Sequence, residues 1–177
     1  EVEIQTNLSL LPNPFDGIVF SGNFTLMKSQ TYYPFYISRR GPPPRFTPII
    51  VDTTRSGPMP GQAEKIWNIA VGYEKGGFSG RLSIVFMGKS LIFVGTQEEL
   101  DGYTDEYHRW DLALQQKIFS GFSLYLNFNN ITNVSDRSFL GNHQFPTNEE
   151  YFGWSADLGV SLDSKQLVPN SMFQSSQ

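Results

Sequence analysis

The segment Tyr32–Phe46, YYPFYISRRGPPPRF, gathers residue types that are well suited to binding a ligand. A guanidinium group stacks on aromatic rings and forms two parallel hydrogen bonds to a carboxylate or phosphate, so this segment could hold an anionic or aromatic molecule. The residues that we predict to contact such a small-molecule ligand are Tyr33, Tyr36, Arg39, Arg40 and Arg45. The alternative interpretation is a proline-stiffened loop whose charges are solvated.

Two other groups of residues could carry chemistry. The segment Thr96–His108 is rich in carboxylates, but their spacing does not fit the EF-hand template, so we interpret it as a solvated acidic loop. His108 and His143 are the only histidines, and no motif places either of them with an aspartate and a serine as a hydrolase would require. The chain has no Cys for a thiolate ligand or nucleophile. We therefore predict no enzyme activity, no metal site and no cofactor.

Composition limits the possible partners. The chain has 177 residues and a formal net charge of -4, which argues against a nucleic-acid partner because phosphates call for a basic face. No apolar run reaches the roughly 18 to 20 residues of a membrane helix. The mean hydropathy of -0.29 is typical of a soluble protein, but alternating membrane strands also give such averages.

The elements that must position these residues are β-strands, because seven segments alternate apolar and polar residues with a period of two. The predicted strands are Val2–Leu10, Ile18–Ser29, Lys65–Glu74, Phe78–Gly88, Tyr107–Ile118, Phe122–Ile131 and Tyr151–Leu162. Several exceed the usual five or six residues and match the roughly 9 to 11 that a tilted strand needs to cross a bilayer.

The connections between these segments alternate between short and long. The short ones are Leu11–Gly17, Lys75–Gly77 and Ser120–Gly121, and the long ones are Gln30–Glu64, Lys89–Glu106 and Thr132–Glu150. Outer-membrane barrels have short periplasmic turns and long outer loops. We therefore predict an all-β fold, an antiparallel up-and-down transmembrane β-barrel segment in which the long connections are extracellular loops.

Alternation also predicts two different faces. In Phe122–Asn129 the apolar residues are expected to face lipid, and the intervening Ser, Tyr and Asn residues a polar lumen. Arg81 and Asp111 fall on the polar face of adjacent strands, where they could pair. Aromatic residues are expected to form two girdles on the apolar face. These are Trp67, Trp110 and Trp154 at the long-loop end, and Phe15, Tyr73, Phe78 and Phe119 at the tight-turn end.

Four stretches resemble the C-terminal β-barrel of TonB-dependent outer-membrane receptors, particularly those of Bacteroidetes-type bacteria. They are EVEIQTNLSLLPNPFDGIVFSGNFT, FSGRLSIVF, DLALQQKIFSGFSLYLNFNNITN and YFGWSADLGVSL, together with Pro60–Gln62 opening a strand. The resemblance covers about Glu1 to Leu162. An odd number of strands also indicates part of a larger barrel, because an open sheet in lipid would leave edge backbone groups unpaired.

The resemblance implies an import function. Such receptors take up scarce ligands (a siderophore, cobalamin or a glycan) across the bacterial outer membrane with energy from the inner membrane. The implied partners are outer-membrane lipid, the remaining barrel and plug domain, and a TonB-type energy transducer that would contact an N-terminal segment lying before Glu1.

Two features stand apart from this interpretation. Residues 163–177 carry no strand pattern and are expected to form a disordered polar tail, whereas the family ends its last strand on an aromatic residue where this chain has about Ser164. The same alternation turned inside out describes a soluble β-barrel or β-sandwich binding module with its apolar face inside. Periodicity does not separate these two arrangements.

Overall fold

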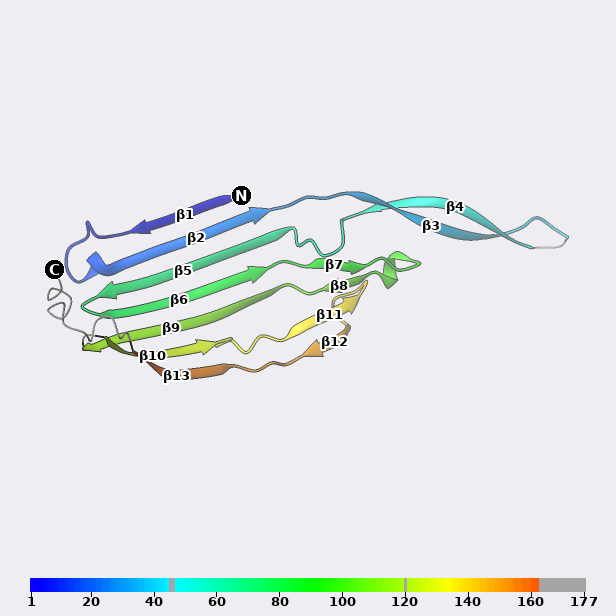
Figure 1. Ribbon diagram of the computed structural model, residues 1–177. Helices are drawn as coiled ribbons and strands as arrows, with labels where there is room; N and C mark the ends of the chain where they lie inside the picture. Colours follow the sequence, from blue (N-terminus) through cyan, green and yellow to red (C-terminus); the bar gives the residue numbers. More distant parts are fainter. Residues whose placement is uncertain (45–46, 120, 163–177) are drawn as a thin grey trace, which may run out of the picture.

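The computed structural model describes residues 1–44, 47–119 and 121–162, and the fold is all-β with antiparallel pairing. The largest element is a seven-stranded sheet in the order β1-β2-β5-β6-β9-β10-β13, which we call the wall sheet (Figure 1). Its strands are β1 (Val2–Asn7), β2 (Ile18–Leu26), β5 (Lys65–Lys75), β6 (Phe78–Met87), β9 (Tyr107–Phe119), β10 (Phe122–Asn129) and β13 (Ser155–Leu162). These are the seven strands that the alternation predicts. The sheet is open, with β1 and β13 at its edges.

Tight turns lie at one end of the wall sheet and long connections at the other (Figure 1). At the tight-turn end, a short 3-10 helix, η1 (Phe15–Gly17), leads into β2. The β5–β6 turn consists of Gly76 and Gly77, with φ angles of 62° and 81°. Two successive left-handed residues give the turn the twist of the flanking strands, and glycine adopts that conformation without steric cost.

All three long connections contain strands that the alternation did not predict. The first forms a two-stranded ribbon, β3 (Thr31–Arg40) and β4 (Pro48–Gly57), which projects beyond the wall sheet (Figure 1). The other two form a second sheet, which we call the cap sheet, in the order β12-β11-β8-β7. Its strands are β7 (Ser90–Phe93), β8 (Gly102–Thr104), β11 (Asp136–Leu140) and β12 (Pro146–Glu150), and the 3-10 helix η2 (Glu98–Leu100) precedes β8.

The two faces of the wall sheet differ in polarity along every strand. Strand register aligns Ile69 with Ile84 and Ile84 with Trp110, so that apolar residues form continuous rows across the sheet. We call this side the apolar face. On the other side, the polar face, Asn23 aligns with Asn68, and Asn127 with Asp157. The predicted division of each strand into an apolar and a polar side is therefore present.

Aromatic residues cluster at both ends of the apolar face. At the long-connection end, Trp67 stacks on Phe86 with ring centroids 5.3 Å apart. At the tight-turn end, Phe119 stacks on Phe122 at 4.8 Å, and Tyr73 lies 6.4 Å from Phe78. Trp67, Tyr73, Phe78 and Phe119 of the predicted girdles take part in these pairs, and the girdles themselves stay a prediction.

Burial is concentrated away from the wall sheet. The buried hydrophobic residues of the described chain are Ala63, Ala70, Leu91 and Phe139. Three of them belong to the cap sheet or its junction with the wall sheet, where Ala63 bridges to Ser90. Apolar side chains of the wall sheet remain accessible instead, Leu158 being 77% exposed. The predicted tail, 163–177, lies outside the described residues.

Candidate functional site

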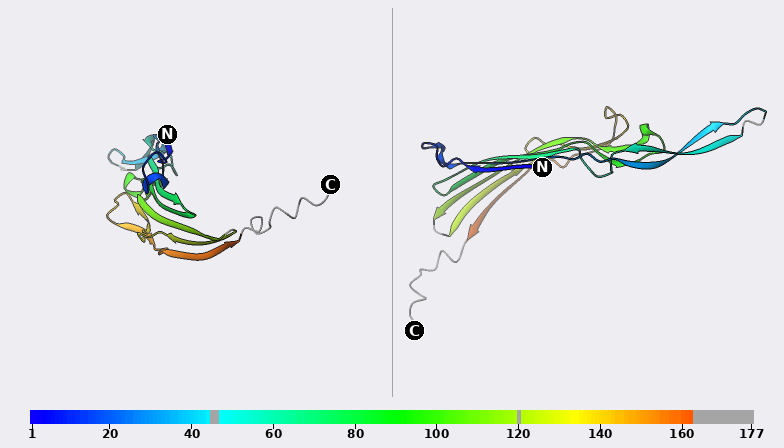
Figure 2. Two further views of the ribbon diagram at one scale, coloured as in Figure 1. Left: turned by 90° about the vertical axis from the view of Figure 1, so that its left-hand side faces the viewer. Right: turned by 90° about the horizontal axis from the view of Figure 1, so that it is seen from above.

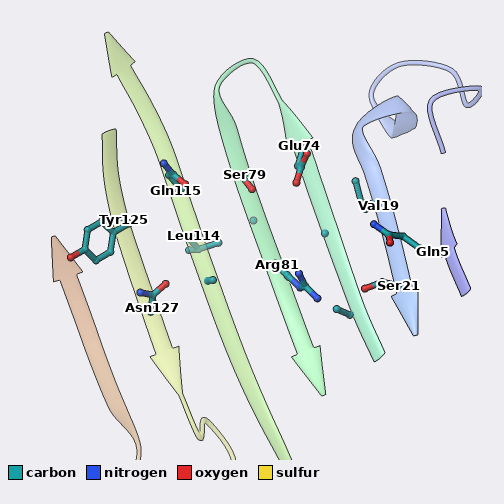
Figure 3. A pocket seen from close by; sticks show the side chains of 14 residues that line it. Gln5, Val19, Ser21, Glu74, Ser79, Arg81, Leu114, Gln115, Tyr125 and Asn127 are labelled. Atoms are coloured by element: carbon teal, nitrogen blue, oxygen red, sulfur yellow. The ribbon is translucent and has the colours of Figure 1, made fainter. Parts of the chain in front are cut away.

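The wall sheet is curved (Figure 2), and its polar face carries a hollow. A hollow of about 360 Å³ is lined by residues of six strands, β1, β2, β5, β6, β9 and β10. Figure 3 shows the polar and charged side chains that project into it. They are Gln5, Ser21, Glu74, Ser79, Arg81, Gln115, Tyr125 and Asn127. A cavity of this volume with convergent hydrogen-bonding groups is within the range of small-molecule sites.

Small residues keep the middle of this hollow open. Arg81 aligns with Gly72 on β5 and with Ala113 on β9, so neither ladder neighbour has a side chain beyond a methyl group. Further along, Tyr125 aligns with Gly159, and its ring fills the space that a Cβ of that glycine would take. Large polar side chains therefore rise at the margins of the hollow, and the guanidinium of Arg81 stands near its middle (Figure 3).

The expected pairing of Arg81 with Asp111 is wrong. Register places Asp111 opposite Ser83, one step along the face from Arg81. Asp111 is instead 3.3 Å from Arg109 and accepts a hydrogen bond from the backbone N–H of Asn130 at 2.8 Å. Two positive or donor groups thus already satisfy this carboxylate, so it does not turn toward Arg81.

Asn130 organises the long-connection end of the polar face. It is buried and has a left-handed backbone with a φ of 54°, which asparagine tolerates better than most residues. Its side-chain amide donates to the carbonyls of Val134 and Gly153, and its side-chain oxygen accepts from the N–H of Val134. The motif Asn-Asn-Ile-Thr-Asn therefore has a structural role, in tying the end of β10 to the start of β13.

The predicted ligand residues lie on strand β3 and not in a loop. Tyr33 and Arg39 occupy odd positions and Tyr36 and Arg40 even ones, so the strand places them on opposite faces of the β3–β4 ribbon. Arg45 lies outside the described residues. The structure therefore brings these side chains together along one ribbon but does not converge them on one surface. Ligand contact by these residues stays a prediction.

The ribbon is anchored to the cap sheet by Arg55 and Asp101. The guanidinium of Arg55 donates both Nη groups to the Asp101 carboxylate, one bond measuring 2.8 Å, and Asp101 also accepts the Gly95 N–H at 2.8 Å. Burial raises the pKa of Asp101, but the hydrogen bonds from Arg55 and Gly95 and the charge of Arg55 outweigh burial and leave that pKa below its ordinary value. Arg55 also lies 5.7 Å from the ring centroid of Phe35.

The sequence-level interpretation of an entirely solvated acidic loop missed this ion pair. Asp101 is 5% exposed, unlike the acidic residues that precede it in the segment. The Asp-Gly dipeptide was the available signal, since Gly102 begins β8. Asp105 likewise has a basic neighbour, Arg137, at 3.4 Å.

The structure gives a packing contact for one of the two histidines. The imidazole of His143 packs edge-on against Phe139, with ring centroids 6.1 Å apart. Asp105, which lies three residues before His108 in the sequence, pairs with Arg137. Among the described residues, no group of three or more histidine or acidic side chains is arranged to hold a metal ion.

Comparison with known proteins adds no relative. No family model, no curated protein and no solved structure matches the chain. Within the described residues, the structure contains no helix with the length and apolar character to cross a bilayer.

Proposed function

We propose that this chain forms part of the barrel wall of a TonB-dependent receptor in a bacterial outer membrane. In this proposal the receptor imports a scarce small molecule, such as a siderophore, cobalamin or a glycan. The apolar face contacts outer-membrane lipid and the polar face lines the lumen, where a plug domain and the remaining strands complete the protein. A TonB-type transducer supplies the energy from the inner membrane.

The observation that carries the proposal is the uncovered apolar face. Its rows run across the sheet through aligned residues such as Val71, Leu82 and Leu112, and no described segment forms a second layer over them. Exposed apolar area is unfavourable in water by about 25 cal/mol per Å², so a face of this extent requires an apolar neighbour. Hydrocarbon supplies that neighbour without a second protein layer.

Three further features support the same arrangement. Aromatic pairs lie at both ends of the apolar face, as expected where rings meet lipid headgroups. Short turns and long connections are segregated to opposite ends of the wall sheet (Figure 1). The hollow lined by Arg81 lies on the polar face, as expected if that face lines a lumen. A soluble binding module would instead need a packed layer against Val71, Leu82 and Leu112.

The chain lacks cysteine, so single-cysteine variants can test which face meets lipid. We would compare Leu82→Cys with Ser83→Cys in the receptor that contains this chain, reconstituted into lipid vesicles. The Ser83 variant should react with a water-soluble maleimide, whereas a fluorophore at position 82 should be quenched by nitroxide lipids. Thr54→Cys, on the exposed ribbon, is the control for labelling efficiency.

Two labelling results would contradict the membrane assignment. If both positions react equally with the aqueous reagent, or if position 82 is shielded from water and from lipid alike, the membrane assignment is wrong. Shielding from both solvents is the outcome that a soluble sandwich predicts.

A further inference from the structure

Arg81 is the feature of the polar face that the proposed function does not explain. The side chain is exposed in the hollow, and within residues 1–44, 47–119 and 121–162 it makes no ion pair or hydrogen bond. Other basic residues of the described chain show the contrast. Lys75 pairs with Asp16, Arg55 with Asp101, Arg109 with Asp111, and Arg137 with Asp105.

Three carboxylates of the polar face, Asp111, Glu74 and Glu3, line the surface around Arg81, and none of them forms an ion pair with it in the described structure. Asp111 is held by Arg109 and by the N–H of Asn130. Glu74 aligns with Ser79, toward the tight-turn end, and Figure 3 shows the guanidinium of Arg81 extending in the other direction. Because Gly72 and Ala113 flank Arg81 on both sides, its donors have open space around them.

We propose that Arg81 binds an oxyanion, a carboxylate or phosphate group of a small molecule that enters the hollow. A guanidinium presents a planar fork of donors that matches such a group with two parallel hydrogen bonds. The neutral side chains around it, including Gln5, Gln115 and Asn127, supply donors and acceptors for the rest of the molecule. This inference rests on the proposed function, since it takes the hollow to be part of the lumen.

The hollow favours a small molecule over a protein segment as the source of the anion. Its volume of about 360 Å³ lies at the lower end of the range for small-molecule pockets. Its lining has one cation, Arg81, and one carboxylate, Glu74, among uncharged hydrogen-bonding groups, an arrangement that suits a small molecule with one anionic group beside Arg81.

Citrate and inorganic phosphate are the probes for this site. An environment-sensitive fluorophore on Ser79→Cys, two residues before Arg81 on the same face of β6, reports occupancy in the same reconstituted receptor. We expect a saturable response to at least one probe. The citrate arm reports a carboxylate site and the phosphate arm a phosphate site.

Substitutions at Arg81 then test the residue itself. In the Ser79→Cys background, Arg81→Gln should weaken binding of the responding probe about tenfold, since hydrogen bonds to charged groups contribute about 1.5 to 3 kcal/mol. Arg81→Lys should retain part of the affinity, because it keeps the charge but loses the planar fork. Lys65→Gln removes the same formal charge from an exposed position outside the hollow and should leave the affinity unchanged.

Two outcomes overturn the inference. One is the absence of a saturable response in the chain that retains Arg81, and the other is equal affinity in the Arg81→Gln and Arg81→Lys variants and the chain that retains Arg81. The cysteine reactivities of positions 82 and 83 are measured without any anion. A failure of the anion site is therefore distinguishable from a failure of the membrane assignment.

Discussion

The wall sheet and the cap sheet belong to one chain but differ in how far their apolar side chains are exposed. In the cap sheet Phe139 is 2% exposed and stacks on Tyr103 with centroids 5.5 Å apart, and Leu91 is 3% exposed. In the wall sheet Leu158 and Val160 stay 77% and 56% exposed. The cap sheet makes its own small core, whereas the wall sheet must obtain its apolar surroundings from elsewhere.

The difference in apolar exposure indicates the surroundings in which each sheet would be stable. A packed core lowers free energy by removing apolar area from water, so it is useful where water is the surroundings. A face of aligned apolar rows with aromatic ends is useful where hydrocarbon is the surroundings. The same chain therefore carries one region with a packed core and one with an uncovered apolar face, as expected if the long connections lie outside a membrane in the way we propose.

The largest effect should follow truncation of the cap core. Phe139→Ala removes the buried ring that contacts Tyr103 and His143, and should destabilise the cap sheet by about 3 to 5 kcal/mol. Hydrogen exchange of amides in β7, β8 and β11 would measure the loss. The matched control is Phe145→Ala, since Phe145 is 72% exposed. Equal loss of protection in the two variants would show that the cap sheet has no core.

A smaller effect should separate the two faces of the wall sheet. Leu82→Lys places a charge in the middle of the apolar face and should cost about 2 to 4 kcal/mol in a bilayer, whereas Ser83→Lys on the polar face should cost little. Unfolding by denaturant in lipid vesicles would measure both. If the lysine at position 83 were as costly as the one at position 82, the polar face would not be in contact with water.

The wall sheet could be predicted from sequence because the alternation of apolar and polar residues recurs in each of its strands. Each of its strands alternates over enough residues for a period of two to be distinguished, and the same alternation sorts the side chains into two faces. The ends were less well predicted. The segment Tyr151–Leu162 was expected to be extended throughout, but β13 begins at Ser155, after the left-handed Gly153.

The cap sheet could not be predicted in the same way. Its strands have three to five residues, too short for alternation to be distinguished from chance. In the ribbon, Pro34 and Pro48 interrupt the pattern and favoured a loop interpretation, although both are compatible with the outer edges of a two-stranded ribbon. Local sequence therefore did not predict the strands of the cap sheet or of the ribbon. The pairing of the cap strands depends on segments that are distant in the sequence.

The pairing register of the strands was the feature of the candidate site that the sequence did not predict. Sequence placed Arg81 and Asp111 on the correct face but could not say that Asp111 aligns with Ser83. A one-step difference along the face decides whether the two charges meet. The uncompensated charge of Arg81 thus follows from register and from the alternative partners of Asp111, neither of which is readable from residue spacing.

The smallest of the three effects should concern the ion pair that joins the ribbon to the cap sheet. Because the pKa of Asp101 is lowered in the folded protein, the pair contributes fully above the ordinary carboxyl pKa of about 4, and that contribution is lost as pH falls through the folded value. Protease resistance of the ribbon should therefore be constant from pH 7 to about 5 and decline below about 4. Asp101→Asn should weaken the attachment by about 1 to 3 kcal/mol at neutral pH and remove this acid dependence.

Lys75 and Asp16 provide the control, because they form the same type of ion pair, 2.6 Å apart, at the tight-turn end of the wall sheet. Both side chains are 36% exposed, compared with 21% for Arg55 and 7% for Asp101, so water competes for the Lys75–Asp16 pair. Lys75→Met should leave the protease resistance of the ribbon and its acid dependence unchanged. If Asp101→Asn behaved like Lys75→Met, the ribbon would be held by its backbone connections, and the buried pair would have no role in its attachment.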